Sequence, residues 1–306
     1  MAQPLIRLTA LTKRYGAVTA LDGLSLDLQP GIIGLVGANG AGKSTLLKIL
    51  LGLLAPTSGT ATVLDLDAAR HGTRLRELVG YMPEDDCLPP DVSATDLVAH
   101  LAQVSGLPAT AARERTADAL RHVGLFEERY RAIGGYSTGM KQRVKLAQAI
   151  VHDPRLLLLD EPTNGLDPAG REEMLELVRR TGAEFGIAVV VASHLLGEIE
   201  QVCDFLVAIE GGRLLHAAPL AAFTGDTGSL VVEVEDGAEG LAERLRQTGF
   251  RVARDGRSVL VEVTGDGVYD AVRDAVVALD LALDRLEPGR RTLEDLFRDA
   301  PAGSEP

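Results

Sequence analysis

The sequence predicts an α/β fold built on a mainly parallel sheet, followed by a smaller α+β domain. The short apolar runs IIGLV, LLLLD and AVVVAS have the length of buried strands, and each ends at a polar or glycine residue. Longer stretches of helical periodicity lie between them, such as ATDLVAHLAQVSGL and REEMLELVRRTGAEFG. Buried strands that alternate with helices are typical of a parallel sheet covered by helices on both faces. In such sheets, ligands bind beyond the carboxyl ends of the strands.

Composition narrows the class of protein. The chain has 306 residues, which is enough for one large domain or two ordinary ones. Its net charge of −13 argues against nucleic acid as a partner, because affinity for a phosphate backbone needs a basic surface. No uncharged apolar stretch reaches the ~18 residues needed to cross a bilayer, and the N-terminus lacks a secretory layout, so we expect a cytoplasmic protein. Cys87 and Cys203 stand far apart, which predicts neither a disulfide framework nor a zinc site.

A change of composition near Phe223 predicts a domain boundary. We expect a first domain over residues 1–222, a linker over 223–228, a second domain over 229–300 and a tail over 301–306. The pattern after the linker is strand, helix, strand, strand, helix, strand, which is the order of a ferredoxin-like α+β domain. A final helix is predicted in TLEDLFRD.

The strongest local signal is GANGAGKST, which directly follows the IIGLV strand and matches the pattern G-x-x-x-x-G-K-[ST]. Its glycines let the backbone wrap with N–H groups aimed at phosphate oxygens, and the helix that opens near Lys43 adds a positive N-terminal dipole. In this pattern the lysine reaches the β- and γ-phosphates, and the hydroxyl of Ser44 coordinates Mg²⁺. The candidate nucleotide-binding residues here are Gly37, Ala38, Asn39, Gly40, Ala41, Gly42, Lys43, Ser44 and Thr45.

A pair of carboxylates follows another buried strand. The run LLLLD ends in Asp160, and Glu161 comes next. We expect Asp160 to hold Mg²⁺ through its water shell, and Glu161 to polarise the water that attacks the γ-phosphate. Without the phosphate loop, both could equally be charges that merely end a strand.

The segment YSTGMKQRVKLAQAIVHDP, residues 136–154, resembles the signature of the ATP-binding-cassette (ABC) family. Ser137 and Gly139 match the residues that contact phosphate in that family, whereas Thr138 and Met140 depart from its commonest signature. The physical interpretation agrees, because Ser137 and Gly139 open a long helix and present a hydroxyl, an N–H group and a positive dipole. An N-capped surface helix would explain Ser137 but not the whole string.

The resemblance covers most of the first 220 residues and implies further roles. Tyr15 matches the aromatic position that stacks on adenine. Asp167 resembles a residue of the loop that touches the opposing subunit, and His194 resembles the switch histidine that contacts the γ-phosphate. Glu84 stands where the family usually has glutamine. A carboxylate can still ligate Mg²⁺, but it brings an extra negative charge near the phosphates.

The resemblance implies a fold, a reaction and partners. The fold is that of a P-loop NTPase, with an antiparallel β subdomain and a helical subdomain at about residues 88–153. The reaction is ATP hydrolysis, with ATP and Mg²⁺ as cofactors. The residues implied are Lys43, Glu161 and His194 for catalysis, and Ser44, Glu84 and Asp160 for the metal. Two such subunits, identical or different, would sandwich two ATP molecules and bind a separate membrane permease on the inner face of the cell membrane.

The accessory domain ending in TLEDLF resembles the tails of ATP-binding subunits of ABC-2-type exporters of drugs, antibiotics, lipids or polysaccharides. This resemblance implies export. Two alternatives stay open from the sequence: a non-transport ABC ATPase acting in DNA repair or on ribosomes, and a P-loop kinase. The first generally carries a coiled-coil insertion or two cassettes, and neither is visible. The second leaves YSTGMKQR and His194 without a role.

Overall fold

The computed structural model describes residues 3–223, 226–263, 265, 267–290 and 293. The chain divides into two compact units, residues 1–220 and 221–306. Within the described residues, no helix is both long and apolar enough to cross a membrane. The predicted domain limits, 1–222 and 229–300, remain predictions.

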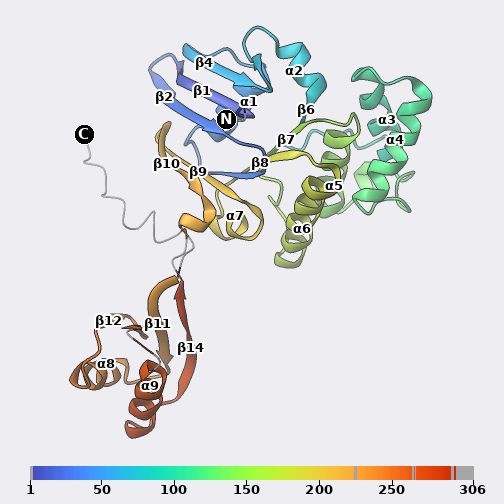
Figure 1. The fold of residues 1–306 in the computed structure, drawn as a ribbon. Coiled ribbons are helices and arrows are strands. Elements are labelled where there is room, and N and C mark those ends of the chain that lie inside the picture. Colours follow the sequence, from blue (N-terminus) through green and yellow to red (C-terminus); the bar gives the residue numbers. More distant parts are fainter. Residues whose placement is uncertain (1–2, 224–225, 264, 266, 291–292, 294–306) are drawn as a thin grey trace. The chain divides into compact units, whose positions relative to one another are not determined.

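A six-stranded sheet lies at the centre of the first unit (Figure 1). Its strand order is β10-β9-β3-β8-β7-β6, and every neighbouring pair is parallel except β10 with β9. The strands are β3 (Ile32–Val36), β6 (Val79–Met82), β7 (Leu156–Asp160), β8 (Ala188–Ser193), β9 (Phe205–Glu210) and β10 (Arg213–Pro219). All residues of β7 and β8 are buried, as expected for strands covered on both faces. The predicted mainly parallel sheet is confirmed.

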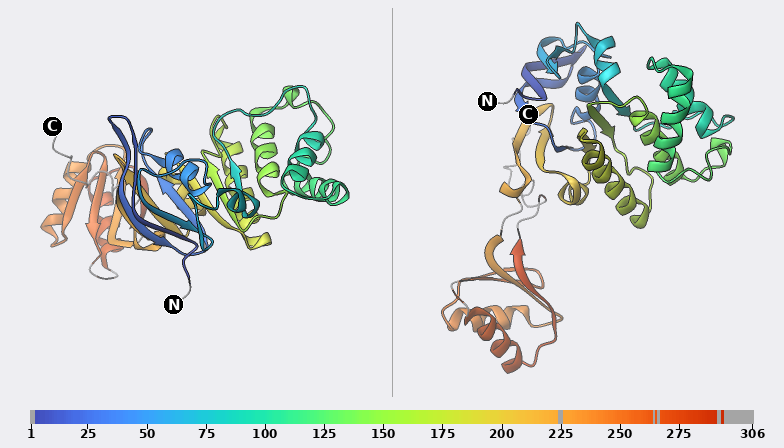
Figure 2. Two further views of the ribbon diagram at one scale, coloured as in Figure 1. Left: turned by 90° about the horizontal axis from the view of Figure 1, so that it is seen from above. Right: turned by 45° about the vertical axis from the view of Figure 1, so that its right-hand side comes forward.

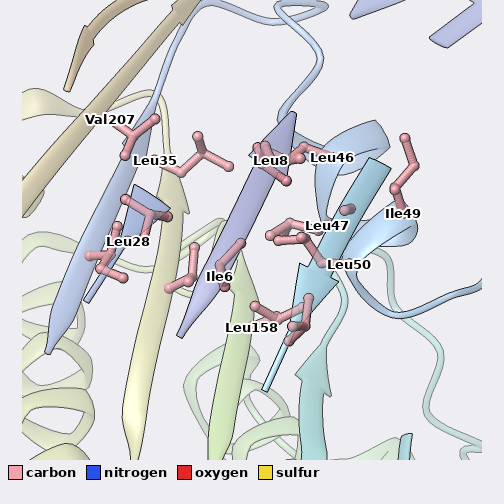
Figure 3. Close-up of a cluster of buried hydrophobic side chains, with 14 of the residues drawn as sticks. Ile6, Leu8, Leu28, Leu35, Leu46, Leu47, Ile49, Leu50, Leu158 and Val207 are labelled. Atoms are coloured by element: carbon pink, nitrogen blue, oxygen red, sulfur yellow. The ribbon is translucent and has the colours of Figure 1, made fainter. Parts of the chain in front are cut away.

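A second sheet, with the order β2-β1-β4-β5, is antiparallel throughout. It consists of β1 (Ile6–Tyr15), β2 (Val18–Leu28), β4 (Ser58–Val63) and β5 (Leu66–Asp67). Its inner face shares one apolar core with the central sheet and with α1 (Lys43–Leu50) (Figure 3). Ile6 and Leu8 come from this sheet, Leu35 from β3, and Leu46 and Leu47 from α1. The shared core fixes the N-terminus of α1 next to the end of β3.

The helical subdomain contains α3 (Ala94–Val104), α4 (Ala109–His122), the 3₁₀ turn η1 (Ile133–Gly135) and α5 (Thr138–Ile150). Figure 2 shows these helices, in green, gathered at one side of the first unit. The unit also contains α2 (Gly72–Leu78), α6 (Pro168–Phe185) and α7 (Leu196–Val202), and the 3₁₀ turn η2 (Leu220–Ala222) spans its end. Side chains cap the first turns of α3, α5 and α6, since Ser93, Ser137 and Asp167 each accept a backbone N–H three residues on.

The second unit has the predicted order of elements. It contains β11 (Asp226–Val234), α8 (Ala238–Gln247), β12 (Val252–Asp255), β13 (Ser258–Glu262), α9 (Gly267–Ala278) and β14 (Leu283–Arg290). The strands form an antiparallel sheet in the order β12-β13-β11-β14. Alternate residues of β11 and β13 are buried with apolar residues of both helices, so both helices cover one face. The segment predicted as the helix TLEDLFRD and the tail lies outside the described residues, except for Leu293.

The start of β11 differs from the prediction. The strand begins at Asp226, inside the segment 223–228 that the sequence predicts as a linker, because Asp226 pairs with Arg290 of β14. Its partner lies 64 residues further along the chain (290 − 226), so local composition carries no sign of this pairing.

The strand β6 and the helix α5 approach each other closely at Gly80. A Cβ atom on Gly80 would lie 2.1 Å from the carbonyl oxygen of Ala149 on α5. No side chain fits at this distance, so the glycine sets how near the helix comes to the sheet.

We therefore expect Gly80→Ala to lower the free energy of unfolding by about 1–3 kcal/mol, because the added methyl group forces strand and helix apart. Gly197, exposed on α7 with open space at its Cβ position, supplies the control. Gly197→Ala should leave stability unchanged or raise it by up to about 1 kcal/mol. Denaturant unfolding of both variants measures the two values. Equal stability of Gly80→Ala and the parent would show that the close contact imposes no constraint.

Candidate functional site

The predicted phosphate-binding residues form the loop between β3 and α1, at the carboxyl edge of the central sheet. Residues 38–45 of this loop, with Ala20, Glu84 and Glu161, line a cavity of about 300 Å³. Gly42 has a φ of 105°, and a Cβ there would lie 2.5 Å from the carbonyl oxygen of Ala20. Only glycine suits this left-handed, crowded position, which explains why the pattern requires it. The first turn of α1 carries no acidic residue of its own, so the positive end of the helix dipole faces the cavity.

The side chain of Lys43 reaches back across the phosphate loop to its first residue, Gly37. Its Nζ donates to the carbonyl oxygen of Gly37 at 2.7 Å and lies 3.4 Å from Oε1 of Glu161. Both charged side chains are buried, with 7 % and 6 % of their surface exposed. A buried ammonium needs such partners, because desolvation of an unpaired charge costs several kcal/mol. The hydrogen bond to Gly37 and the contact with Glu161 therefore hold the Lys43 side chain at the cavity.

Glu161 lies between Lys43 and His194. Its Oε2 is 2.9 Å from Nδ1 of His194, which follows β8 and is 44 % exposed. Its backbone has a φ of 49°, and its N–H donates to the carbonyl oxygen of Ala192 on β8 at 2.9 Å. A left-handed conformation is uncommon for a residue with a side chain, and the neighbouring strand holds it here. The structure thus brings the three residues predicted to be catalytic into one contact chain.

Asp160 is a buried carboxylate with an unused oxygen. Burial raises the pKa of its carboxyl group, and the negative charges of Glu84 and Glu161 raise it further. A hydrogen bond from Ser44 and the positive charge of Lys43 lower it. Its Oδ1 is buried without a hydrogen-bond partner. A cation beside Asp160 and Ser44 would supply the missing partner, so these residues fit Mg²⁺.

The described residues contain no group of three or more acidic, histidine or cysteine side chains placed to hold a metal ion. This agrees with the way Mg²⁺ is bound, through one or two carboxylates together with substrate phosphates and water. Glu84 faces the same cavity, and its Oε1 accepts a hydrogen bond from Nδ2 of Asn164 at 3.3 Å. The predicted role of Glu84 and Asp160 as metal ligands stays a prediction.

Ser137, Gly139 and Asp167 lie elsewhere on the first unit. They line a second cavity, of about 560 Å³, which shares no lining residue with the phosphate-loop cavity. Ser137 Oγ accepts the backbone N–H of Met140 at 3.3 Å, and Asp167 Oδ1 accepts that of Gly170 at 3.1 Å. Within one chain, the structure does not bring these residues to the phosphate loop.

Tyr15 is also outside the phosphate-loop cavity. It ends β1, is 49 % exposed, and lines neither of the two cavities. Lys13 Nζ lies 5.2 Å from the centre of its ring. The predicted role of Tyr15 in adenine binding stays a prediction.

Sequence comparison assigns the family. Residues 21–164 match the family model described as ABC transporter. The ABC transporter ATP-binding protein YdbJ of Bacillus subtilis is 33% identical over 298 residues, which cover 97% of this chain and 95% of that one. The chain belongs to the ABC transporter ATP-binding proteins. As an ABC ATPase it binds ATP and couples ATP hydrolysis to transport, and this membership removes the kinase alternative.

Further relatives and solved structures agree with this family. The bacitracin transport ATP-binding protein BcrA of Bacillus licheniformis is 37% identical over 216 residues, covering 70% of both chains. The Nod factor export ATP-binding protein I of Ralstonia nicotianae is 36% identical over 233 residues, covering 76% of this chain and 72% of that one. CbiO1 of Clostridium perfringens, part of the ABC transporter complex CbiONQ, superposes with a TM-score of 0.67 at 29% identity, over 72% of this chain and 90% of that one.

Several residues around the site were not predicted. The Tyr81 hydroxyl hydrogen-bonds Asp160, and burial raises the pKa of Tyr81 strongly. Ser193 Oγ donates to the buried carboxylate of Glu198 at 2.8 Å and accepts the N–H of Leu195 at 3.1 Å, which fixes the backbone on both sides of His194. Lys145 is buried on α5. The one available signal was Lys145 itself, a lysine within the mainly apolar run VKLAQAI of a chain with only five lysines.

We expect Lys43→Ala to weaken ATP binding at least tenfold, or about 1.4 kcal/mol, because it removes the buried cation that faces the phosphates. Lys48→Ala is the matched control, since Lys48 is exposed on the same helix and should change affinity less than twofold. Titration with a fluorescent ATP analogue gives both affinities. An unchanged affinity in folded Lys43→Ala would remove Lys43 from phosphate binding.

Proposed function

We propose that this chain is the ATPase subunit of an ABC exporter and that two subunits act as a head-to-tail pair around two ATP molecules. The observation that carries this proposal is the separation of the two halves of the site. The phosphate loop and Glu161 line one cavity, and Asp160 is hydrogen-bonded to Ser44 of that loop, whereas Ser137 and Gly139 line another cavity. A pair of subunits can place the serine-led tip of α5 from one copy over the phosphates held by the other. A bacterial ABC transporter cassette that was solved as a dimer superposes with a TM-score of 0.63 at 25% identity, over 70% of this chain and 98% of that one.

In this proposal each residue has a definite task. The N–H groups of residues 38–45 and the ammonium of Lys43 bind the β- and γ-phosphates. Glu161 orients and polarises the attacking water, and His194 holds the Glu161 carboxylate on its other side. Ser44, Asp160 and Glu84 would hold Mg²⁺, which neutralises phosphate charge when bound. Tyr15 would stack on adenine.

The same arrangement explains how hydrolysis moves the subunits. Each ATP bridges the phosphate loop of one subunit and the Ser137 tip of the other, so binding favours the closed pair. Loss of the γ-phosphate removes part of that bridge and favours opening. A ligand shifts a two-state equilibrium in this way only because it binds the two states with different affinity.

In this proposal, ATP hydrolysis drives a membrane permease that is a separate chain. We infer that it binds the region of residues 88–132 together with the Glu84 loop. Val104 and Tyr130 in this region are each 70% exposed, and exposed apolar side chains of this size favour a protein contact. This places the chain in the cytoplasm, held on the inner face of the membrane by the permease.

Export is supported by relatives named for bacitracin transport and Nod factor export. The YdbJ relative is similar over 97% of the chain, so the second unit belongs to the shared architecture. We also infer that this unit is a ferredoxin-like module, because its six elements and its sheet order β12-β13-β11-β14 fit that fold. Its role in this proposal is packing or stabilisation of the pair.

We expect Glu161→Gln to keep ATP binding, to reduce turnover at least about 100-fold, and to accumulate an ATP-bound dimer. The amide preserves the shape of the side chain but cannot polarise water as a carboxylate does. Light scattering after size exclusion, with and without ATP, measures the dimer. Glu176→Gln, on the exposed side of α6, should behave as the parent protein. A monomer that holds ATP would contradict the paired site.

We expect the tagged chain to co-purify from detergent-solubilised membranes with a multi-span membrane protein. Tyr130→Asp should lower that recovery at least fivefold, because it places a charge in the inferred contact, while ATP affinity stays within twofold. Leu53→Asp, which alters an exposed apolar residue outside the helical subdomain, is the control. Recovery that is equal for both variants would place the permease contact elsewhere.

A further inference from the structure

Lys145 is a buried lysine whose three N–H bonds all meet backbone carbonyls. It lies on α5, is 3% exposed, and its Nζ donates to the carbonyl oxygens of Pro83 at 2.7 Å, Glu84 at 3.0 Å and Asp85 at 3.2 Å. An ammonium has three donors and no acceptor, so these bonds satisfy it completely. The lysine thereby fastens three consecutive residues of the loop after β6 to the helix.

Burying the ammonium of Lys145 costs free energy, because the charge loses its hydration. Burial lowers the pKa of Lys145, whereas the Cys87 thiol and the carboxylates of Asp86, Asp85 and Glu84 act in the opposite direction. A buried ammonium is tolerated only with near-complete hydrogen bonding. The same position could hold an apolar side chain at no such cost, since Val144, Leu146 and Ala149 of the same helix are buried as well. The lysine is therefore matched to the loop carbonyls.

A second connection runs from α5 to the side chain of Glu84. Gln142 Nε2 donates to the backbone carbonyl of Asn164 at 2.9 Å, and Asn164 Nδ2 donates to Glu84 Oε1 at 3.3 Å. Lys145 thus fixes the backbone of the loop, and the Gln142–Asn164 connection directs the carboxylate. The absent side chain of Gly80 lets α5 come close enough for both.

We propose that Lys145 is a positioning residue for Glu84, which holds the backbone of residues 83–85 so that the Glu84 carboxylate faces the phosphate-loop cavity and its cation. The inference rests on the proposed function, because it takes Glu84 as a ligand of Mg²⁺. It also accounts for an acidic residue at this position. Lys145 holds the backbone of Glu84, and Asn164 Nδ2 holds its carboxylate. The side chain is therefore kept from turning away from the phosphates.

The test measures metal binding apart from hydrolysis. Mn²⁺ affinity is determined from the EPR signal of free Mn²⁺ in the presence of a non-hydrolysable ATP analogue. The full chain is compared with Lys145→Met, Lys141→Met and Glu84→Ala. Lys145→Met keeps the length of the side chain and removes its donors. Lys141→Met is the matched control, because Lys141 lies one turn earlier on α5 and pairs with the exposed Asp86, at 3.0 Å.

Lys145→Met and Glu84→Ala are each expected to weaken Mn²⁺ binding about tenfold, as loss of an outer-shell contact or a ligand does. Affinity for the analogue in EDTA should stay within twofold, and Lys141→Met should change neither value more than twofold. The Mg²⁺ concentration for half-maximal hydrolysis should rise in parallel. A general loss of folding would lower the number of sites without shifting the affinity of those that remain.

Two results overturn the inference, and they have different meanings. A shift in Glu84→Ala with none in Lys145→Met rejects Lys145 as the positioning residue and leaves the proposed function intact. No shift in either removes Glu84 from the metal site, and the role of Lys145 with it. If Lys145→Met does not fold, Lys145→Gln retains two donors and should show a smaller shift in the same direction. Parent-like affinity in that variant rejects the inference.

Discussion

The ion pair between Lys43 and Glu161 is the contact around which the rest of the site is organised. Two charges can be buried together only if the fold delivers them with matched geometry, and here the parallel sheet does so. The loop after β3 supplies the lysine, the end of β7 supplies the glutamate, and the end of β8 supplies His194. All three strands end at one edge because their apolar residues are buried side by side. In the proposed mechanism, a phosphate in the cavity would offer Lys43 a second anion and leave Glu161 free to polarise water.

The division of the site is the feature that the proposed pair of subunits would complete. Ser137 and Asp167 have a structural role within one chain, since their side chains cap α5 and α6. Each also lines a surface cavity away from the phosphate loop. Capping residues sit at helix N-termini, where backbone N–H groups and the helix dipole attract anions. The same physical feature that begins the helix therefore prepares it to meet a triphosphate carried by a neighbour.

Most of the fold and the phosphate side of the site could be predicted from the sequence, because local chemistry dictates local spacing. Glycine at position 42, lysine at 43 and carboxylates at 160 and 161 follow from what a phosphate and a strand end require. Contacts between distant segments could not be predicted in this way. Lys145 lies 62 residues from Pro83, so no local pattern indicates which carbonyl groups its ammonium contacts. The Ser193–Glu198 contact and the pairing that starts β11 at Asp226 likewise depend on neighbours that only folding brings together.

The helix α5 begins beside Ser137 and carries Lys145 eight residues later, about 12 Å along its axis. A regular helix of this length bends little, so its tip and its attachment to the loop move as one lever. In the proposed pair, the loop contacts one nucleotide and the tip contacts the other. A push on the loop from the membrane side would therefore be transmitted along α5 to the nucleotide held by the other subunit.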